Sequence, residues 1–159
     1  MRNRFGGDLG ADKQPSPVWL FDLDNTLYPA SCGLMEALNA RISLYLEQHL
    51  GLPPSLADQM REEYFGVYGS SVRGVLLHRR VEAADLLDFI HDLPVEDYLS
   101  RDPRLADELG ALRGHKHLFT NAPAKYAWRV LRALGLEDQL LKLISKTRSK
   151  MSSSRVSNH

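Results

Sequence analysis

The sequence has a single cysteine, no net charge and no long apolar run. Cys32 alone can form neither an internal disulfide nor a thiolate metal cluster, so a reducing, cytoplasmic location is expected. Because the formal net charge is zero, no global field would recruit nucleic acid or a membrane surface. No apolar stretch approaches the roughly 20 residues of a membrane span, and residues 1–16 lack the apolar segment of a signal peptide.

The remaining composition is that of an ordinary globular protein. Hydrophobic residues make up 43% of the chain and charged residues 25%. A length of 159 residues suits one domain, or one core with a small insertion. Residues 1–16 contain Gly6, Gly7 and scattered charges, which predicts a flexible leader ahead of the folded part.

The stretch from Val18 to Leu27 carries the strongest functional signal. Its apolar first half follows Pro17, is too short for a helix, and predicts a buried strand. That half ends on Asp22, and Asp24 and Thr26 follow at two-residue intervals. In an open α/β sheet, ligands bind outside the carboxyl ends of strands, where both carboxylates are placed. Because side chains at i and i+2 leave an extended chain on the same side, Asp22 and Asp24 can converge on one small volume.

Two carboxylates this close repel each other unless a cation or a shared proton relieves the repulsion. Mg²⁺ is the expected cation, because it prefers oxygen ligands and also screens the charge of a phosphate. The pattern therefore predicts phosphoryl chemistry, with Asp22 as nucleophile, Asp24 as acid/base, and both as metal ligands. The alternative is that the two residues only cap a turn, where aspartate is common. That alternative leaves Thr26, and the position after a buried strand, unexplained.

The residues Phe-Asp-Leu-Asp-Asn-Thr-Leu-Tyr-Pro, at positions 21–29, resemble the first motif of the haloacid dehalogenase (HAD) superfamily of phosphohydrolases. Their continuation through Tyr28 and Pro29 is similar to its pyrimidine 5′-nucleotidase branch. Thr120-Asn121 resembles the second motif, whose hydroxyl and following backbone N–H bind a phosphoryl oxygen. The resemblance implies that Asn25, Thr120 and Asn121 hold the phosphate. It also implies Mg²⁺ as cofactor and a small phosphorylated metabolite as substrate.

The fold class implied by the resemblance is α/β, with a HAD-like Rossmannoid core and an inserted α-helical cap. The implied reaction passes through an aspartyl-phosphate, and for this branch the implied substrate is a pyrimidine nucleoside 5′-monophosphate. The core is expected at residues 17–32 and 95–144, the cap at 33–94, and a disordered tail at 145–159. The composition of that tail is rich in Ser, Lys and Arg. The oligomeric state stays open.

Helical spacing fills the chain between the two motifs. Apolar residues recur every fourth position from Leu34 to Leu46, and Gly51 follows as a stop. Three more helices are expected before Pro94: one opened by Pro53-Pro54-Ser55 with Ser55 and Asp58 as a capping pair, one over Val72 to Arg79 with Val72, Val75 and Leu76 inward, and one over Ala83 to His91 burying Leu86, Leu87 and Ile90.

The second half of the chain predicts a return to the sheet. Asp102-Pro103 starts a helix that ends before Gly114, with Leu105, Leu109 and Leu112 as its buried stripe. A second strand is expected at His115 to Phe119, parallel to the first, so that Thr120 lies beside Asp22. The chain then offers an amphipathic helix from Lys125 to Leu134, which would bury Tyr126, Val130, Leu131 and Leu134, and a third strand at Leu141 to Ile144.

Polar and aromatic residues of the expected cap have two interpretations. Tyr64, Tyr68, Arg73 and His78 could face a nucleotide, with Arg73 supplying charge to a phosphate. A tyrosine at helical spacing is more often packed in a core, and a lone Arg or His more often lies on a solvated face. The second interpretation is preferred.

Two features of the superfamily have no counterpart late in the chain. They are a third-motif lysine and a fourth-motif acidic pair, yet no Asp or Glu follows Asp138, and Lys142, Lys146 and Lys150 match the lysine only by residue type. We therefore expect a relative truncated at its C-terminus, with too few strands and an open apolar edge on strand one.

These gaps leave a second function open. The chain would be a catalytically inactive relative whose cap is an interaction or regulatory module. Nucleic-acid binding by the basic tail is disfavoured, because that tail lacks interleaved aromatics and the whole chain is neutral.

Overall fold

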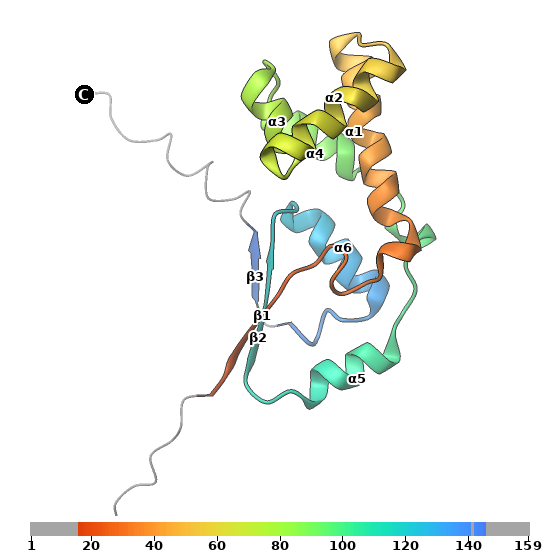
Figure 1. Cartoon of the computed structure of the whole chain (residues 1–159). Helices are drawn as coiled ribbons and strands as arrows, with labels where there is room; N and C mark the ends of the chain where they lie inside the picture. Colours follow the sequence, from red (N-terminus) through yellow and green to blue (C-terminus); the bar gives the residue numbers. More distant parts are fainter. Residues whose placement is uncertain (1–15, 141, 146–159) are drawn as a thin grey trace, which may run out of the picture.

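A computed structural model describes residues 16–140 and 142–145 (Figure 1). The leader expected at 1–16 and the tail expected at 145–159 fall almost entirely outside these residues, as do Lys146 and Lys150. The described elements are β1 (Val18–Phe21), η1 (Ala30–Cys32), α1 (Leu34–Leu50), α2 (Pro54–Tyr68), α3 (Ser71–His78), α4 (Ala83–His91), η2 (Val95–Asp97), α5 (Pro103–Ala111), β2 (His115–Thr120), α6 (Ala124–Leu134) and β3 (Lys142–Ser145).

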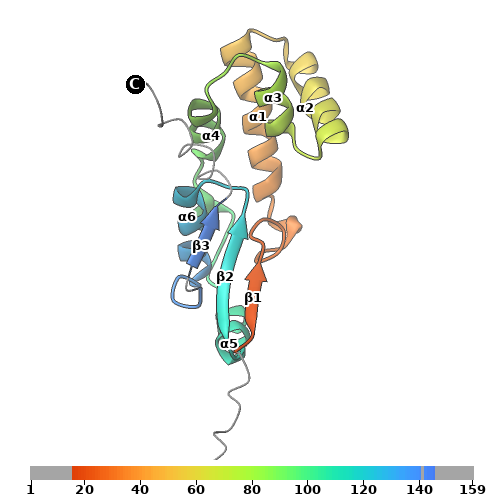
Figure 2. The ribbon, with the colours of Figure 1, turned by 90° about the vertical axis from the view of Figure 1, so that its left-hand side faces the viewer.

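The strands form one three-stranded parallel sheet in the order β1-β2-β3. Phe21 of β1 pairs with Leu118 of β2, and Thr120 pairs with Ser145 of β3. Figure 2 shows the carboxyl ends of all three strands pointing toward the layer formed by α1–α4. Parallel pairing of the first two strands is confirmed, and β3 begins one residue later than expected.

Helices α5 and α6 lie together on one face of the sheet, as both views show (Figures 1 and 2). The amphipathic face expected for α6 is confirmed, since Tyr126, Val130, Leu131 and Leu134 are all buried. These side chains share a hydrophobic cluster with Leu118 of β2 and with the start of α1. Burial of this cluster is the main interaction that holds α6 against the sheet.

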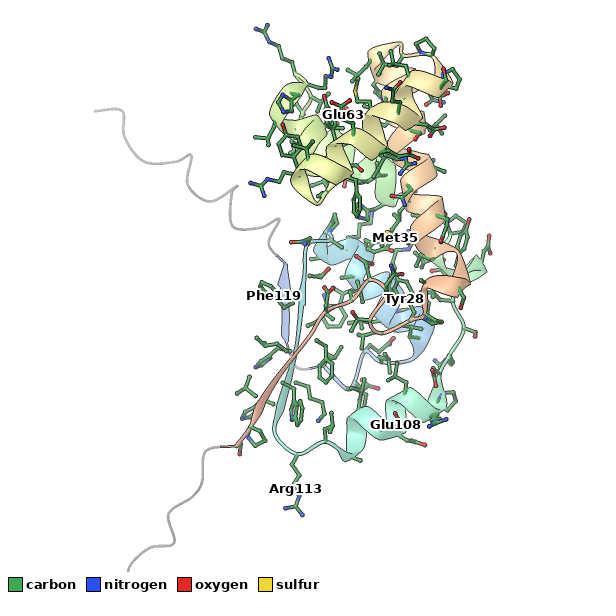
Figure 3. All side chains as sticks on the ribbon, viewed as in Figure 1. Tyr28, Met35, Glu63, Glu108, Arg113 and Phe119 are labelled. Carbon is green, nitrogen blue, oxygen red and sulfur yellow. The ribbon has the colours of Figure 1, made fainter. Side chains whose placement is uncertain are left out.

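Strand β1 is exposed, so the expectation of a buried strand is wrong. Val18 and Leu20 are 60% and 63% exposed, and Trp19 is 40% exposed. In the described part of the chain β1 pairs only with β2, and no helix covers the face opposite α5 and α6. Phe119, labelled in Figure 3, lies on that open side. The open apolar edge expected for strand one is therefore confirmed within the described residues.

Helices α1–α4 form a second layer, called here the helical insertion (residues 34–91), with a hydrophobic cluster of its own. Helix α1 joins the two layers, because Leu34 and Leu38 pack in the sheet cluster while Ile42 and Leu46 pack in the insertion. All four expected helices are present. No helix in the described ranges is long and apolar enough to cross a membrane.

Two local expectations for the insertion are wrong. Ser55 and Asp58 do not form a capping pair, because α2 begins at Pro54 and Asp58 instead accepts a hydrogen bond from Ser43 Oγ at 2.6 Å. Proline at the first position already supplies the helical φ and needs no N–H partner. Leu76 is exposed rather than inward, because α3 turns Ser71, Gly74 and Val75 toward α2.

Gly74 sets the distance between α2 and α3, and a matched pair of substitutions tests this contact. A Cβ at Gly74 would lie 2.3 Å from Tyr64 Cγ, whereas a Cβ at Gly66 of α2 meets nothing within 4 Å. Gly74→Ala should lower the free energy of unfolding by about 1–3 kcal/mol through overpacking. Gly66→Ala should raise it by about 0.5–1 kcal/mol through helix propensity. Urea denaturation measures both, and equal effects of the two substitutions would contradict the packing.

Candidate functional site

The carboxyl ends of β1 and β2 bring together the two sequence motifs. Asp22 directly follows β1, while Thr120 is the last residue of β2 and Asn121 the next. Because neighbouring parallel strands end at the same edge of a sheet, both motifs open toward the helical insertion. The structure thus places Asp22, Asp24, Asn25, Thr120 and Asn121 at one edge, as expected from the sequence.

The chain after Asp22 folds into a tight turn with apolar anchors. The backbone N–H groups of Thr26 and Leu27 donate to Leu23 O at 3.2 and 3.0 Å. Leu23 and Leu27 are buried in the sheet cluster, which fixes the turn against the core. Asn25 has φ 54, a left-handed conformation that asparagine tolerates better than most residues. The polar side chains therefore alternate with anchors that hold the backbone still.

Asp24 lies inside this turn with one carboxylate oxygen occupied. The Tyr28 hydroxyl donates to Asp24 Oδ1 at 2.7 Å. Burial raises the pKa of the Asp24 carboxyl, the hydrogen bond from Tyr28 lowers it, and the nearby negative charge of Asp22 raises it further. The net pKa lies above its usual range, which favours a group that can hold and release a proton.

Asp22 differs from Asp24 in being exposed. No salt bridge to it occurs among the described residues, so its charge is available to a ligand. Its negative charge contributes to raising the pKa of the Asp24 carboxyl two residues on. One solvent-accessible carboxylate beside one half-buried, hydrogen-bonded carboxylate is an arrangement that separates a nucleophile from an acid/base.

Two buried tyrosines line the side of the turn that faces α6. Tyr28 and Tyr126 are both buried, and burial together with the Asp24 charge raises the pKa of each hydroxyl, so both stay protonated at neutral pH. Figure 3 shows Tyr28 between the turn and α6. From the sequence, Tyr28 was predicted only as part of a motif and Tyr126 only as a core residue. The alternation of the motif does not reveal that Tyr28 bonds Asp24.

Thr120 is 1% exposed, and its Oγ1 accepts a hydrogen bond from the backbone N–H of Ala122 at 3.0 Å. The hydroxyl hydrogen is still available for donation, because only a lone pair is used in this contact. The bond shapes the turn that leads from β2 into α6, with Asn121 exposed on it. Helix α6 therefore begins beside the site, with the partial positive charge of its N-terminus at the same edge.

A cavity of about 260 Å³ connects the carboxylate turn with the helical insertion; we call it the chamber. Asp24 and Asn121 lie at its sheet end, and Ala122 lies beside them. The other walls come from the four helices α1–α4 and the loop between α2 and α3: Met35, Leu38, Asn39, Ile42, Phe65, Gly69, Ser70, Ser71, Val72, Leu87, Ile90 and His91. Sequence patterns missed these residues as a group, because they come from four separate segments.

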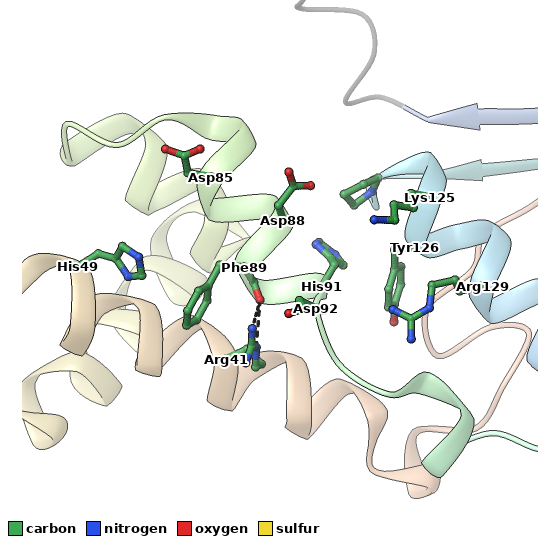
Figure 4. Close-up of a pocket in the computed structure, with 11 residues that line it drawn as sticks. Arg41, His49, Asp85, Asp88, Phe89, His91, Asp92, Lys125, Tyr126 and Arg129 are labelled. Atoms are coloured by element: carbon green, nitrogen blue, oxygen red, sulfur yellow. Dashed lines mark hydrogen bonds between the residues drawn. The ribbon is translucent and has the colours of Figure 1, made fainter.

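A larger groove of about 710 Å³ lies next to the chamber, between α4 and α6 (Figure 4). Asp85 and Asp88 line its α4 side, and Lys125 and Arg129 line its α6 side. None of the five residues predicted from the motifs lines it, so the larger cavity is not where the carboxylates are. His91 borders both cavities, and burial lowers its pKa, which favours the neutral ring.

Three ring-bearing residues of the helical insertion, Tyr64, Tyr68 and His78, pack against one another. The rings of Tyr64, Tyr68 and His78 lie 5.3–6.1 Å apart between centroids, and the Tyr68 hydroxyl contacts His78 Nε2. None of them lines the chamber or the groove, and Arg73 is exposed and lines neither. The preferred interpretation, packing and a solvated face, agrees with this arrangement.

The metal expectation rests on two carboxylates. In the described ranges no group of three or more His, Cys, Asp or Glu side chains could hold an ion. The donor type of Asp22 and Asp24 nevertheless fits Mg²⁺, which is often bound by one or two carboxylates and keeps several waters. Of Lys142 only the backbone is described, so its candidacy as the missing lysine is not tested.

These features describe an α/β protein with two carboxylates after its first strand and a helical insertion between its first two strands. No family model matches the chain. Over 147 aligned residues the chain is 33% identical to Phosphate metabolism protein 8 of Saccharomyces cerevisiae (strain ATCC 204508 / S288c), an alignment that covers 82% of this chain and 45% of that protein. The chain therefore spans less than half the length of this curated relative.

The raised pKa of Asp24 predicts a pH-dependent cost of folding. The pKa of Asp24 is higher in the folded protein than its usual value of 3.8, so the protonated carboxyl stabilises the fold. This contribution is fully present below pH 3.8 and is lost as the pH rises through the pKa of the folded protein. Asp24→Asn stays neutral and can still accept from Tyr28. In EDTA-containing buffer this variant should therefore unfold at a higher temperature than the wild type at pH 7, by about 2–4 °C per kcal/mol.

The difference between Asp24→Asn and the wild type should shrink as the pH falls to about 4. Differential scanning calorimetry from pH 3 to 8 measures it. Exposed Asp107 of α5 provides the control, because Asp107→Asn should change the midpoint little at any pH. A wild type as stable as Asp24→Asn at neutral pH would contradict the assigned burial.

Proposed function

We propose that this chain is a member of the HAD superfamily and hydrolyses small phosphomonoesters. The observation that carries the proposal is the pair of carboxylates after β1: Asp22 is exposed, and half-buried Asp24 accepts from Tyr28 and lines the chamber. The name of the yeast relative, Phosphate metabolism protein 8, agrees with phosphate chemistry. Of the possible substrates we favour pyrimidine nucleoside 5′-monophosphates, because the motif at 21–29 resembles that branch.

In the proposed reaction Asp22 attacks phosphorus in line with the ester bond. The P–O bond to the alcohol breaks as the aspartyl-phosphate forms, and the proton of Asp24 passes to the leaving oxygen. A water molecule then attacks the aspartyl-phosphate while Asp24 takes its proton. Inorganic phosphate leaves, and both carboxylates return to their starting states. Mg²⁺ held by the Asp22 carboxylate and the Asp24 backbone carbonyl oxygen would neutralise part of the charge of the phosphate.

The second motif would hold the phosphate during both steps. The Thr120 hydroxyl has a hydrogen to donate, and the backbone N–H groups around Asn25 and Asn121 lie at the same edge of the sheet. The N-terminus of α6 favours negative charge there. Tyr28 keeps Asp24 Oδ1 occupied, which leaves Oδ2 as the oxygen for proton transfer.

A second candidate function is an inactive relative whose helical insertion binds a partner or regulates one. It is favoured by one observation: among the described residues, no group of three or more His, Cys, Asp or Glu side chains could hold a metal ion, so the two carboxylates after β1 have no third such ligand there. A missing electrostatic contact typically reduces a rate by about 10²–10³-fold. Losing several such contacts would leave a fold with little turnover.

The test is inorganic phosphate release from a panel of nucleoside monophosphates and small phosphate esters, with and without Mg²⁺. Release by the wild type should require Mg²⁺ and should fall in Asp22→Asn by more than the roughly 10²–10³-fold expected for one electrostatic contact. Asp107→Asn on the far side of α5 should behave like the wild type. Undiminished turnover in Asp22→Asn would sink the proposal, and no release from folded wild-type protein would favour the inactive relative.

A further inference from the structure

We propose that the chamber selects phosphomonoesters whose leaving group is neutral, compact and partly apolar, and rejects those that carry a second phosphate. This inference rests on the proposed function, because it takes Asp24 and Asn121 as the place where the ester bond lies. It assigns the remaining chamber residues to the alcohol part of the substrate.

The walls of the chamber are mostly apolar. Met35, Leu38 and Ile42 come from one side of α1, and Leu87 and Ile90 come from α4. Figure 3 shows Met35 at the end of the helical insertion that faces the turn after β1. An apolar ring placed against these side chains would leave water, which favours binding in proportion to the buried apolar area.

Asn39 is the polar group best placed to recognise the leaving group. It lies one turn beyond Met35 on α1, lines the chamber, and is half-buried. The nearby serines are already engaged, since Ser71 donates to Arg61 O at 2.7 Å and Ser70 accepts from Arg73 N at 3.3 Å. An asparagine amide offers both a donor and an acceptor without charge. This favours a ring with a polar edge.

No lysine or arginine of the described ranges lines the chamber. The basic side chains of the adjoining groove have other partners, since Arg41 bonds Phe89 O at 3.0 Å and Arg129 bonds Leu93 O and Glu96. His91 is the one chamber residue that could become cationic, and burial favours its neutral form. A second phosphate would therefore enter an apolar space without a counter-charge, which is strongly unfavourable.

The size of the chamber limits the leaving group. Its volume of about 260 Å³ is below the roughly 300–1,000 Å³ of common small-molecule sites. One ring system with a short linker fits such a space better than an extended chain. The adjoining groove shares His91 with the chamber but is lined by Asp85, Asp88, Lys125 and Arg129, so its chemistry does not suit an apolar ring.

The experiment compares ligands that differ in one group. Binding of phenyl phosphate, 1,4-phenylene bisphosphate and inorganic phosphate is measured by titration calorimetry with Mg²⁺, using Asp22→Asn protein so that turnover does not consume the ligand. Phenyl phosphate should bind at least about tenfold more tightly than either of the others. Equal affinity of phenyl phosphate and inorganic phosphate, or a preference for the bisphosphate, would overturn the inference.

A charge introduced at the rim provides the second arm. Phe65 lines the chamber and Val67 does not, yet both lie on α2 and are 62% and 65% exposed, so an arginine at either position should not disturb folding. Added to the same background, Phe65→Arg should raise the affinity for the bisphosphate at least about fivefold. Val67→Arg should leave it unchanged. Identical behaviour of the two arginine variants would also overturn the inference.

The two proposals fail separately in this design. If the wild type releases no phosphate but the binding preferences hold, the proposed hydrolysis fails and the chamber assignment stands. If the wild type hydrolyses phosphomonoesters while the binding preferences are absent, the assignment fails and the hydrolysis stands.

Discussion

Parallel pairing of β1 with β2 is the interaction on which the candidate site depends. Pairing of Phe21 with Leu118 brings the turn after β1 and the turn after β2 to one edge of the sheet. Leu23 and Leu27 anchor the first turn, and the Thr120 hydroxyl shapes the second. The carboxylates are therefore positioned by buried apolar groups and backbone hydrogen bonds, and the charged groups themselves contribute little to their own placement. A one-residue slip of this pairing would move every side chain to the other face.

The helical insertion completes the site by adding a wall that the sheet cannot provide. Helix α1 packs in both hydrophobic clusters, so it holds the insertion over the turn after β1, and its buried and half-buried side chains also line the chamber. Asp24 is half-buried at the sheet end of this wall, where its charge opposes folding. An acidic group kept in an unfavourable environment is typical of functional sites, because no gain in stability explains it. Between the sheet layer and the helical insertion there are therefore two cavities: the chamber, with mostly apolar walls, and the groove, with charged walls.

Local patterns in the sequence predicted much of the fold. The fourfold spacing from Leu34, the Asp102-Pro103 start and the amphipathic face of α6 each depend on nearby residues, and each is present. The exposure of β1 was not predicted, because burial of a strand depends on what packs against it and not on its own apolar content. The two aspartates followed from their spacing. The bond from Tyr28 to Asp24 and the chamber residues could not follow, since they depend on how separate segments meet.

The central claim is that Asp22 is the residue that becomes phosphorylated. The most direct measurement is acid quenching of the wild-type protein during reaction with a phosphomonoester and Mg²⁺, followed by mass-spectrometric mapping of the phosphorylated peptide. The account predicts an acyl-phosphate on Asp22 that is absent in Asp22→Asn. It should accumulate in Asp24→Asn when the ester has a leaving group that needs no proton, such as 4-nitrophenyl phosphate, because this variant then lacks only the group that activates water. Phosphate release without a phosphorylated Asp22, or phosphorylation of a different residue, would contradict it.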